Sequence, residues 1–327
     1  MFTSKKKHNH KITARHETAG IVISRYGTII GLLLLISLFI VLKPGIFPRF
    51  KNVVNILNQI SLLGIISAGL TVCMIMNDFD VSIAAIATLC GVLVVALLPH
   101  MNMWLAISII LLLGLAIGFA NGIVITILGV SSFIATLAMM SILKGITIWY
   151  TGGYSLYSGI PRSFVNLARG TLLSIPYLVF YMLFIVLFCY FILGYSQWGK
   201  KFYAVGGNPE AARFSSISIT RTRIAGFLIS GFLSSLTGIL MASRLSSGQP
   251  RAGEGLLLNA FAAVFLGAVT IRNGQFHAGG TLIGVLIMGV TFNGLTILGI
   301  PFFLQYVIQG AILILAVAAS GSYKRSY

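Results

Sequence analysis

The chain has 327 residues, of which 57% are hydrophobic and only 8% are charged, and its formal net charge is +17. Soluble domains carry about 25% charged residues, so this composition excludes an ordinary soluble domain. Long unbroken apolar runs predict an all-α polytopic membrane protein, because a β-barrel would need segments of about ten residues with alternating hydrophobicity. The basic residues flank the apolar runs, as the positive-inside bias requires, so the positive charge does not indicate a nucleic-acid partner.

The distribution of polarity predicts three regions. We expect a basic N-terminal tail at 1–25, a transmembrane domain at 26–320 and a C-terminal tail at 321–327. The first apolar run ends in Lys-Pro-Gly without a small-residue cleavage site, so it predicts an uncleaved span and not a signal peptide. Ten apolar runs approach the roughly 20 residues that cross a bilayer. These predicted spans are 26–43, 53–76, 81–99, 103–127, 131–150, 173–194, 222–243, 256–271, 277–299 and 302–320.

The charges between the spans predict which side each loop faces. With the N-terminus in the cytoplasm, fourteen Lys and Arg residues fall inside and seven fall outside, while Lys144 falls within a span. This excess on the inside agrees with the positive-inside bias. We therefore expect an N-in, C-in topology that also places a polar loop at 195–221 in the cytoplasm.

The most polar interruption of the apolar domain is a basic island at 199–223, GKKFYAVGGNPEAARFSSISITRTR. Its middle has the signals of a helix start: a glycine pair for a sharp entry, an N-cap, a proline at the first helical position and an acid in the first turn. These residues are Gly206, Gly207, Asn208, Pro209 and Glu210. The signals favour a short amphipathic helix at about 209–216 that serves as a docking surface; a solvated charged loop is the alternative.

Two of the five acidic residues, Asp78 and Asp80, lie in the polar stretch NDFDVS between the second and third predicted spans. A carboxylate at membrane depth is costly and is usually functional. Asp80 also fits the N-cap of the following helix, with help from Ser82, because its oxygen can accept free backbone amides. A helix cap and a direct role in a translocation path are two compatible interpretations, and both stay open.

No pattern of catalytic or metal-binding residues is present in the sequence. The chain has no G-x-x-x-x-G-K-[ST] phosphate loop, no HExxH and no Cys/His cluster, and its three cysteines lie within apolar runs. We therefore expect a protein that is not an enzyme and that holds no cofactor and no metal ion. ATP hydrolysis that drives such a protein should take place on a separate partner.

Two packing patterns occur among the spans. Glycines at four-residue spacing, at 114, 118 and 122 and again at 280 and 284, predict close contacts between helix backbones. The stretch TLCGVLV at 88–94 is similar to TLIGVLI at 281–287, and each copy follows a polar stretch. This similarity suggests a parallel internal repeat, as transporters often have, although apolar helices of similar composition would explain it equally well.

Several stretches resemble those of one transporter family. They are YAVGGNPEAARFSSISI in the island, NDFDVSIAAI at 77–86, FIATLAMMSILKG at 133–145 with YTGG after it, and the long stretch 243–289. All four are similar to permeases of ABC transporters of the ribose/xylose/autoinducer-2 class, and they occur in order over most of residues 50–320. The resemblance implies the permease subunit of an ATP-driven ABC importer for a sugar or sugar-like solute, in the bacterial cytoplasmic (inner) membrane.

The resemblance also implies partners and site residues. The partners are a second permease copy or a paralogue, two ABC ATPase domains, an extracytoplasmic solute-binding protein, the sugar and membrane lipid. The ATPase would contact a coupling segment at 206–213, made of Gly206, Gly207, Asn208, Pro209, Glu210, Ala211, Ala212 and Arg213. The candidate residues of the translocation path or gate are Asp78, Asp80, Ser82, Phe133, Thr136, Asn259 and Asn293.

Some positions depart from the family pattern. They are Ala84, Ser216, Asn259, Arg272 and Asn273, and they bear on which solute is carried. The rival hypothesis is a stand-alone secondary transporter that uses Asp78 or Asp80 as its proton or sodium site, but it leaves the island unexplained. A membrane-embedded enzyme is a third hypothesis, and the lack of paired acid, base or metal ligands argues against it.

Overall fold

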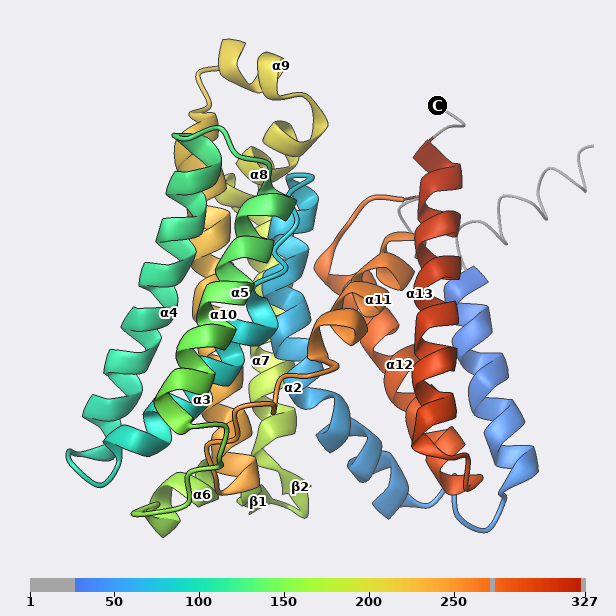
Figure 1. The fold of residues 1–327 in the computed structure, drawn as a ribbon. Coiled ribbons are helices and arrows are strands. Elements are labelled where there is room, and N and C mark those ends of the chain that lie inside the picture. Colours follow the sequence, from blue (N-terminus) through green and yellow to red (C-terminus); the bar gives the residue numbers. More distant parts are fainter. Residues whose placement is uncertain (1–26, 271–273, 325–327) are drawn as a thin grey trace, which may run out of the picture.

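The computed structural model describes residues 27–270 and 274–324, where the chain forms a helical bundle with one short hairpin (Figure 1). The hairpin pairs β1 (Thr171–Leu172) with β2 (Ile175–Pro176). The helices are Gly27–Leu42, α2 (Phe50–Ile75), α3 (Ile83–Leu97), α4 (Met103–Thr126), α5 (Ser132–Thr151), α6 (Arg162–Arg169), α7 (Tyr177–Tyr195), α8 (Gln197–Gly207), α9 (Pro209–Phe214), α10 (Ile219–Leu245), α11 (Leu256–Ala268), α12 (Ala278–Ile297) and α13 (Phe302–Lys324).

A helix occupies each of the ten ranges that the sequence predicts as spans. Within the described residues, α2, α4, α5, α7, α10 and α12 are long and apolar enough to cross a membrane. The other four ranges hold the shorter apolar helices Gly27–Leu42, α3, α11 and the 302–318 part of α13. The all-helical, multi-pass architecture is therefore confirmed, while ten complete spans with both termini inside stay a prediction. The N-terminal tail lies outside the described residues, and α13 continues to Lys324, past the predicted boundary at 320.

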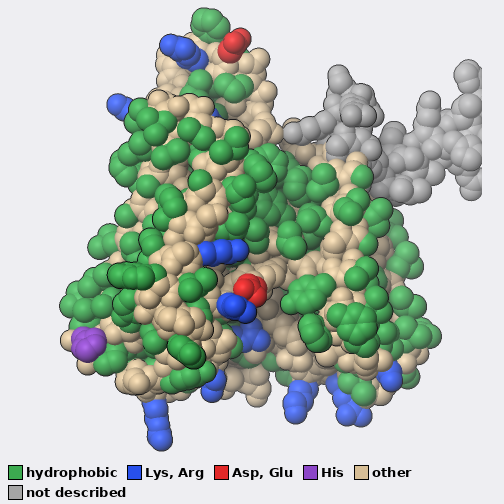
Figure 2. Space-filling view, viewed as in Figure 1, with side chains coloured by type: hydrophobic (Ala, Val, Ile, Leu, Met, Phe, Trp, Pro, Cys, Tyr) green, Lys and Arg blue, Asp and Glu red, His purple; other side chains and the backbone are tan. Residues whose placement is uncertain are grey.

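The helices α2, α3 and α10 form the centre of the molecule and are buried over most of their length. Helix α10 packs against α2, α3 and α4, and α11 packs against α12 and α13. A helix enclosed by other helices has no solvated face, which explains why α3 is apolar on all sides. The helices α4, α5 and α7 keep exposed apolar faces, and hydrophobic side chains cover much of the surface seen in Figure 2.

The glycines at four-residue spacing bring helix backbones together, as predicted. A Cβ atom at Gly118 of α4 would overlap the carbonyl oxygen of Phe227 in α10, and one at Gly231 of α10 would overlap the carbonyl oxygen of Gly114. At the other contact, a Cβ at Gly284 of α12 would overlap the carbonyl oxygen of Ala263 in α11. Small residues at these crossings therefore set the distance between the helix axes.

The two ends of the bundle differ (Figure 1). Helices α8 and α9 lie together at one end, and α6 with the β1–β2 hairpin lies at the opposite end. Helix α13 ends toward the side of α8 and α9. This is the relative placement that the charge census predicts for the basic island and the C-terminus.

The two stretches of the suggested repeat lie in different surroundings. The 88–94 stretch lies in α3, which packs against α10, whereas the 281–287 stretch lies in α12, which packs against α11 and α2. The parallel repeat stays a prediction. Two of the departures from the family pattern, Arg272 and Asn273, lie outside the described residues.

Candidate functional site

A polar segment at 77–82 links the end of α2 to the start of α3, and all of its residues except Asn77 and Phe79 are buried. The Oδ1 atom of Asp80 accepts hydrogen bonds from the amide and the hydroxyl of Ser82, at 3.0 and 2.6 Å. Its Oδ2 atom accepts a hydrogen bond of 2.7 Å from the hydroxyl of Ser230 in α10. The side-chain amide of Asn121 in α4 donates to the Ser82 hydroxyl at 2.9 Å. One fully buried carboxylate therefore joins the polar segment to α10 and, through Ser82, to α4.

The start of α5 supports the other side of the polar segment. The Thr136 hydroxyl accepts the amide of Val81 at 3.0 Å and lies 3.1 Å from the carbonyl oxygen of Phe79. The Ser132 hydroxyl accepts the Phe79 amide at 3.1 Å. The ring of Phe133 meets that of Phe79 edge to face, with 6.5 Å between the ring centroids. The structure thus brings together four predicted site residues: Asp80, Ser82, Phe133 and Thr136.

Three members of this hydrogen-bond network, Asn121, Ser132 and Ser230, were not predicted as site residues. Each is a buried polar residue in a helix that is otherwise apolar enough to cross a membrane. A polar side chain inside such a helix needs a partner within the protein, so its presence was the signal that could have found them.

The prediction that Asp80 is the N-cap of the following helix is wrong. Ser82 is the N-cap residue of α3, and its side chain makes no capping hydrogen bond. Asp80 accepts the amide of Ser82 itself, two residues on, as in an Asx turn, and no amide within α3. The carboxylate therefore fixes the turn that leads into α3 and ties it to Ser230.

Asp78, which is also buried, has a different partner. Arg223 of α10 donates from Nε to its Oδ2 at 2.7 Å, and the second guanidinium nitrogen pairs with Oδ1. A two-pronged ion pair of this kind fixes both charge and orientation. Arg223 is the last residue of the predicted basic island, so the island contacts the polar segment directly.

The end of α8 touches the polar segment as well. The side chain of Asn77 donates to the carbonyl oxygen of Gly206 at 2.5 Å. A Cβ atom at Gly206 would overlap the carbonyl oxygen of Ile75, the last residue of α2, so only glycine allows this approach. Helix α8 is therefore joined both to the end of α2 and to the polar segment.

The predicted helix start at Asn208 is confirmed. The Asn208 side chain accepts the Ala211 amide at 3.0 Å, and Pro209 opens α9. Helix α9 ends at Phe214 and not at 216, because Ser216 adopts a left-handed backbone with φ of 61°. Figure 1 shows α9 projecting at one end of the molecule.

Two details of the predicted coupling segment are wrong. Gly206 and Gly207 form no sharp entry, since they are the last residues of α8 and the break comes at the extended Asn208. Ala212 is buried, so within the alanine pair only Ala211 is exposed. The exposed coupling residues are Gly207, Asn208, Pro209, Glu210, Ala211 and Arg213.

Two predicted path residues lie outside the Asp80 network. Asn259 is in α11 and Asn293 is in α12, and neither makes a hydrogen bond to the polar segment among the described residues. The Oδ1 atom of each is buried without a partner within the described part of the chain. Their roles in a path stay predictions.

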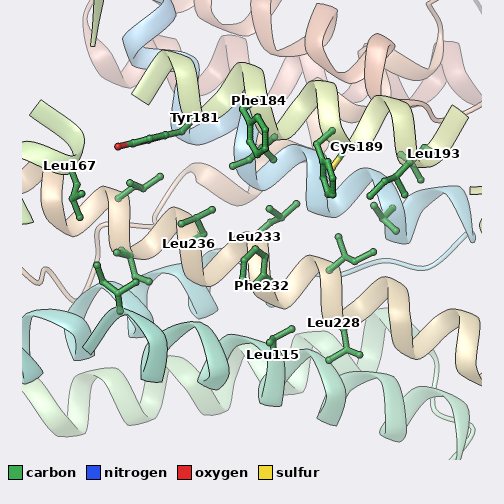
Figure 3. A pocket seen from close by; sticks show the side chains of 18 of the residues that line it. Leu115, Leu167, Tyr181, Phe184, Cys189, Leu193, Leu228, Phe232, Leu233 and Leu236 are labelled. Atoms are coloured by element: carbon green, nitrogen blue, oxygen red, sulfur yellow. The ribbon is translucent and has the colours of Figure 1, made fainter. Parts of the chain in front are cut away.

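An apolar groove of about 670 Å³ lies on α10, between α4 and α7. Figure 3 shows side chains of α7, including Phe184 and Leu193, facing side chains of α10, including Leu228 and Phe232. The groove opens beside exposed residues such as Phe184 and Trp104, on the apolar outer surface of the bundle. A wall of this kind offers a polar solute nothing to bind.

The Asp80 network predicts different outcomes for two substitutions. Asp80→Asn should keep a near-normal yield and melting temperature, because the amide oxygen can still accept from Ser82. Asp80→Leu should lower both, since several buried donors lose their acceptor at about 1–3 kcal/mol each. The measurement is monodisperse yield and thermal unfolding in detergent. If Asp80→Asn folds normally and abolishes transport, the charge itself is functional.

The Asp78–Arg223 pair predicts non-additive effects. Asp78→Asn or Arg223→Gln alone should destabilise the protein by roughly 3 kcal/mol, because each leaves a partly buried charge without its partner. The double variant should recover much of that loss, since two neutral amides can bond to each other. The exposed Arg221→Gln is the matched control. Additive losses in thermal unfolding would contradict a direct interaction.

Comparisons with known proteins identify the family. Residues 52–317 match the family described as "Branched-chain amino acid transport system / permease component". The chain is 35% identical to the ribose import permease protein RbsC of Escherichia coli K12 over 294 residues, which is 89% of this chain and 91% of the relative. It is 36% identical to RbsC of Bacillus subtilis, covering 90% and 92%, and 32% identical to the L-arabinose ABC transporter permease protein AraH of Azospirillum brasilense, covering 90% and 87%. No solved structure matches. The chain therefore belongs to this family of transport-system permease components.

Proposed function

We propose that the chain is the permease subunit of an ATP-driven importer for a monosaccharide. The relatives named for ribose, L-arabinose and D-allose transport support this solute class. The observation that carries the proposal is α9, a capped and exposed helix whose neighbour α8 is bonded to the buried polar segment. An ATPase that contacts α9 would act on the polar segment through residues already in contact.

The proposal requires partners. The sequence holds no phosphate loop, so the energy must come from ABC ATPase subunits that bind the coupling segment. An extracytoplasmic binding protein would deliver the sugar, and a second permease copy or a paralogue would complete the path. The whole complex would lie in the bacterial cytoplasmic membrane, with the α8–α9 end inside and the α6 end outside.

A route for coupling follows from the contacts at the inner end. Asn77 bonds to Gly206 of α8, and Asp78 bonds to Arg223 of α10. A movement of α8 would therefore pull on the polar segment and on the start of α10 together. The Asp80 network would transmit that movement to α4 and, with Thr136, to α5. Packed helices move as units that slide or rotate, which suits this arrangement.

The ion-coupled alternative lacks such support. A proton or sodium site needs a carboxylate that can exchange its partner for the ion. Asp78 is paired with Arg223, and Asp80 accepts hydrogen bonds from Ser82 and Ser230. Both carboxylates are thus occupied by structural partners.

Reconstitution tests the proposed function. In proteoliposomes, the permease with its ATPase and binding protein should concentrate a labelled monosaccharide from a panel of ribose, arabinose and allose only when ATP is supplied. The permease alone should show no ATP hydrolysis and no concentrative uptake. If the permease alone accumulates the sugar when a proton or sodium gradient is applied, the proposal is overturned in favour of the ion-coupled alternative.

The coupling segment predicts a second outcome. Ala211→Arg and Gly207→Asp should each leave a folded permease, because both positions are exposed and a Cβ at Gly207 meets no atom within 4 Å. Both should weaken co-purification with the ATPase by at least about tenfold and stop uptake, since they add a charged side chain to the contact surface. Leu173→Arg, an exposed change at the opposite end, is the control. Normal ATPase binding by both variants would show that α9 is not the docking site.

A further inference from the structure

A second cavity, of about 350 Å³, lies between α3, α5 and the 246–255 loop that leads into α11. Its polar lining includes Thr88, Lys144, Thr147, Arg251 and Glu254. The apolar part of its wall comes from α5 and α11, for example from Leu257. In both volume and polarity it differs from the apolar groove on α10.

Lys144 is an exposed charged residue that lines this cavity from within an apolar helix. The residue lies in α5, one of the helices long and apolar enough to cross a membrane, seven residues before the helix ends. At about 1.5 Å per residue, this places its backbone about 10 Å inside the end of α5. It makes no hydrogen bond or ion pair with the residues that the structure describes. A lysine at such a depth is tolerated where it faces a water-filled space, and the cavity is the space that it lines.

The other polar groups complement Lys144. Arg251 and Glu254 face each other across 3.9 Å, from Nε to Oε1, and both side chains are largely exposed. The Thr147 hydroxyl donates to the carbonyl oxygen of Leu143, which leaves its oxygen free to accept. Figure 2 shows acidic and basic side chains gathered near the middle of one face, between areas covered by hydrophobic side chains. The cavity therefore offers donors, acceptors and an apolar wall together.

The loop that bears Arg251 and Glu254 is held firmly against α3. The Gly253 amide donates to the Thr88 hydroxyl at 3.2 Å, and a Cβ atom at Gly253 would overlap that hydroxyl. Thr88 is thus a positioning residue. The lining residue nearest the start of α3 is Ala84, two residues after Ser82 of the polar segment. The cavity therefore begins close in sequence to the polar segment, although no residue of 77–82 lines it.

We propose that this cavity binds one uncharged monosaccharide on its way through the permease, with Lys144 and Glu254 as the main hydrogen-bonding side chains. Small-molecule sites begin at about 300 Å³ and combine apolar walls with a few placed polar groups, so the volume suits a single sugar ring. Sugar hydroxyls both donate and accept, which matches an ammonium and a carboxylate in one cavity. The inference rests on the proposed function and locates where the sugar is held.

Thiol labelling tests whether the cavity is wet and occupied. In a variant without the buried Cys73, Cys90 and Cys189, the exposed Lys144→Cys should react with an impermeant methanethiosulfonate, and Ser108→Cys on the apolar outer face of α4 should not. The panel sugar that the wild-type importer takes up fastest, supplied with its binding protein, should slow labelling at least fivefold. No labelling at Lys144→Cys would overturn the proposal. If the binding protein without sugar slows labelling equally, the proposal is also overturned. The surface would then be a docking site for the binding protein.

Uptake kinetics test the roles of the side chains. Lys144→Met and Glu254→Gln should each raise the KM for sugar uptake roughly tenfold, because a hydrogen bond to a charged group is lost, with the maximal rate largely kept. Lys144→Arg should retain most of the affinity. Arg162→Gln, exposed at the start of α6, is the control. A wild-type KM in both test variants would overturn the proposal, while ATP-driven uptake by the wild type would still uphold the proposed function.

Discussion

The buried part of a non-helical segment inside a membrane protein must find its hydrogen bonds within the protein, and the mostly buried 77–82 segment bonds to side chains from three helices. Ser132 and Thr136 of α5 bond its backbone, Ser230 of α10 bonds Asp80, and Asn121 of α4 bonds Ser82. These hydrogen bonds form only when each of the bonding side chains lies at a defined position relative to the segment. The segment therefore sets the mutual placement of α4, α5 and α10.

The same segment is where the exposed end of the molecule meets its interior. Asn77 and Asp78 reach out to Gly206 of α8 and Arg223 of α10, whereas Asp80 bonds inward. The chain between these contacts is only a few residues long. It can therefore absorb little of a displacement of α8. Close approach of Gly206 to the end of α2 removes further freedom. A permease driven by a separate motor needs a stiff connection of this kind.

The apolar groove on α10 and the polar cavity at α3 and α5 suit different occupants, because their linings differ in polarity. The groove on α10 is apolar and open beside exposed aromatic residues, so lipid can fill it at no cost. The cavity at α3 and α5 is lined by the charged side chains of Lys144, Arg251 and Glu254, which suit water or a polar solute. The short helices α3 and α11 both border that second cavity.

The sequence by itself determined the class of protein, the positions of ten helices, the cap at Asn208 and the family, because hydropathy, capping chemistry and local motifs are short-range properties. It also singled out Asp80, Ser82 and Thr136. It did not reveal the partners of these residues: Ser230 lies 150 positions from Asp80, and Arg223 lies 145 from Asp78. It also misjudged Ala212 and the two glycines of α8, whose burial and conformation depend on neighbouring helices. In lipid, apolar residues face both the bilayer and the core, so hydropathy does not tell which face of a helix is buried. Only the tertiary structure decided which polar groups meet and which of them line a cavity.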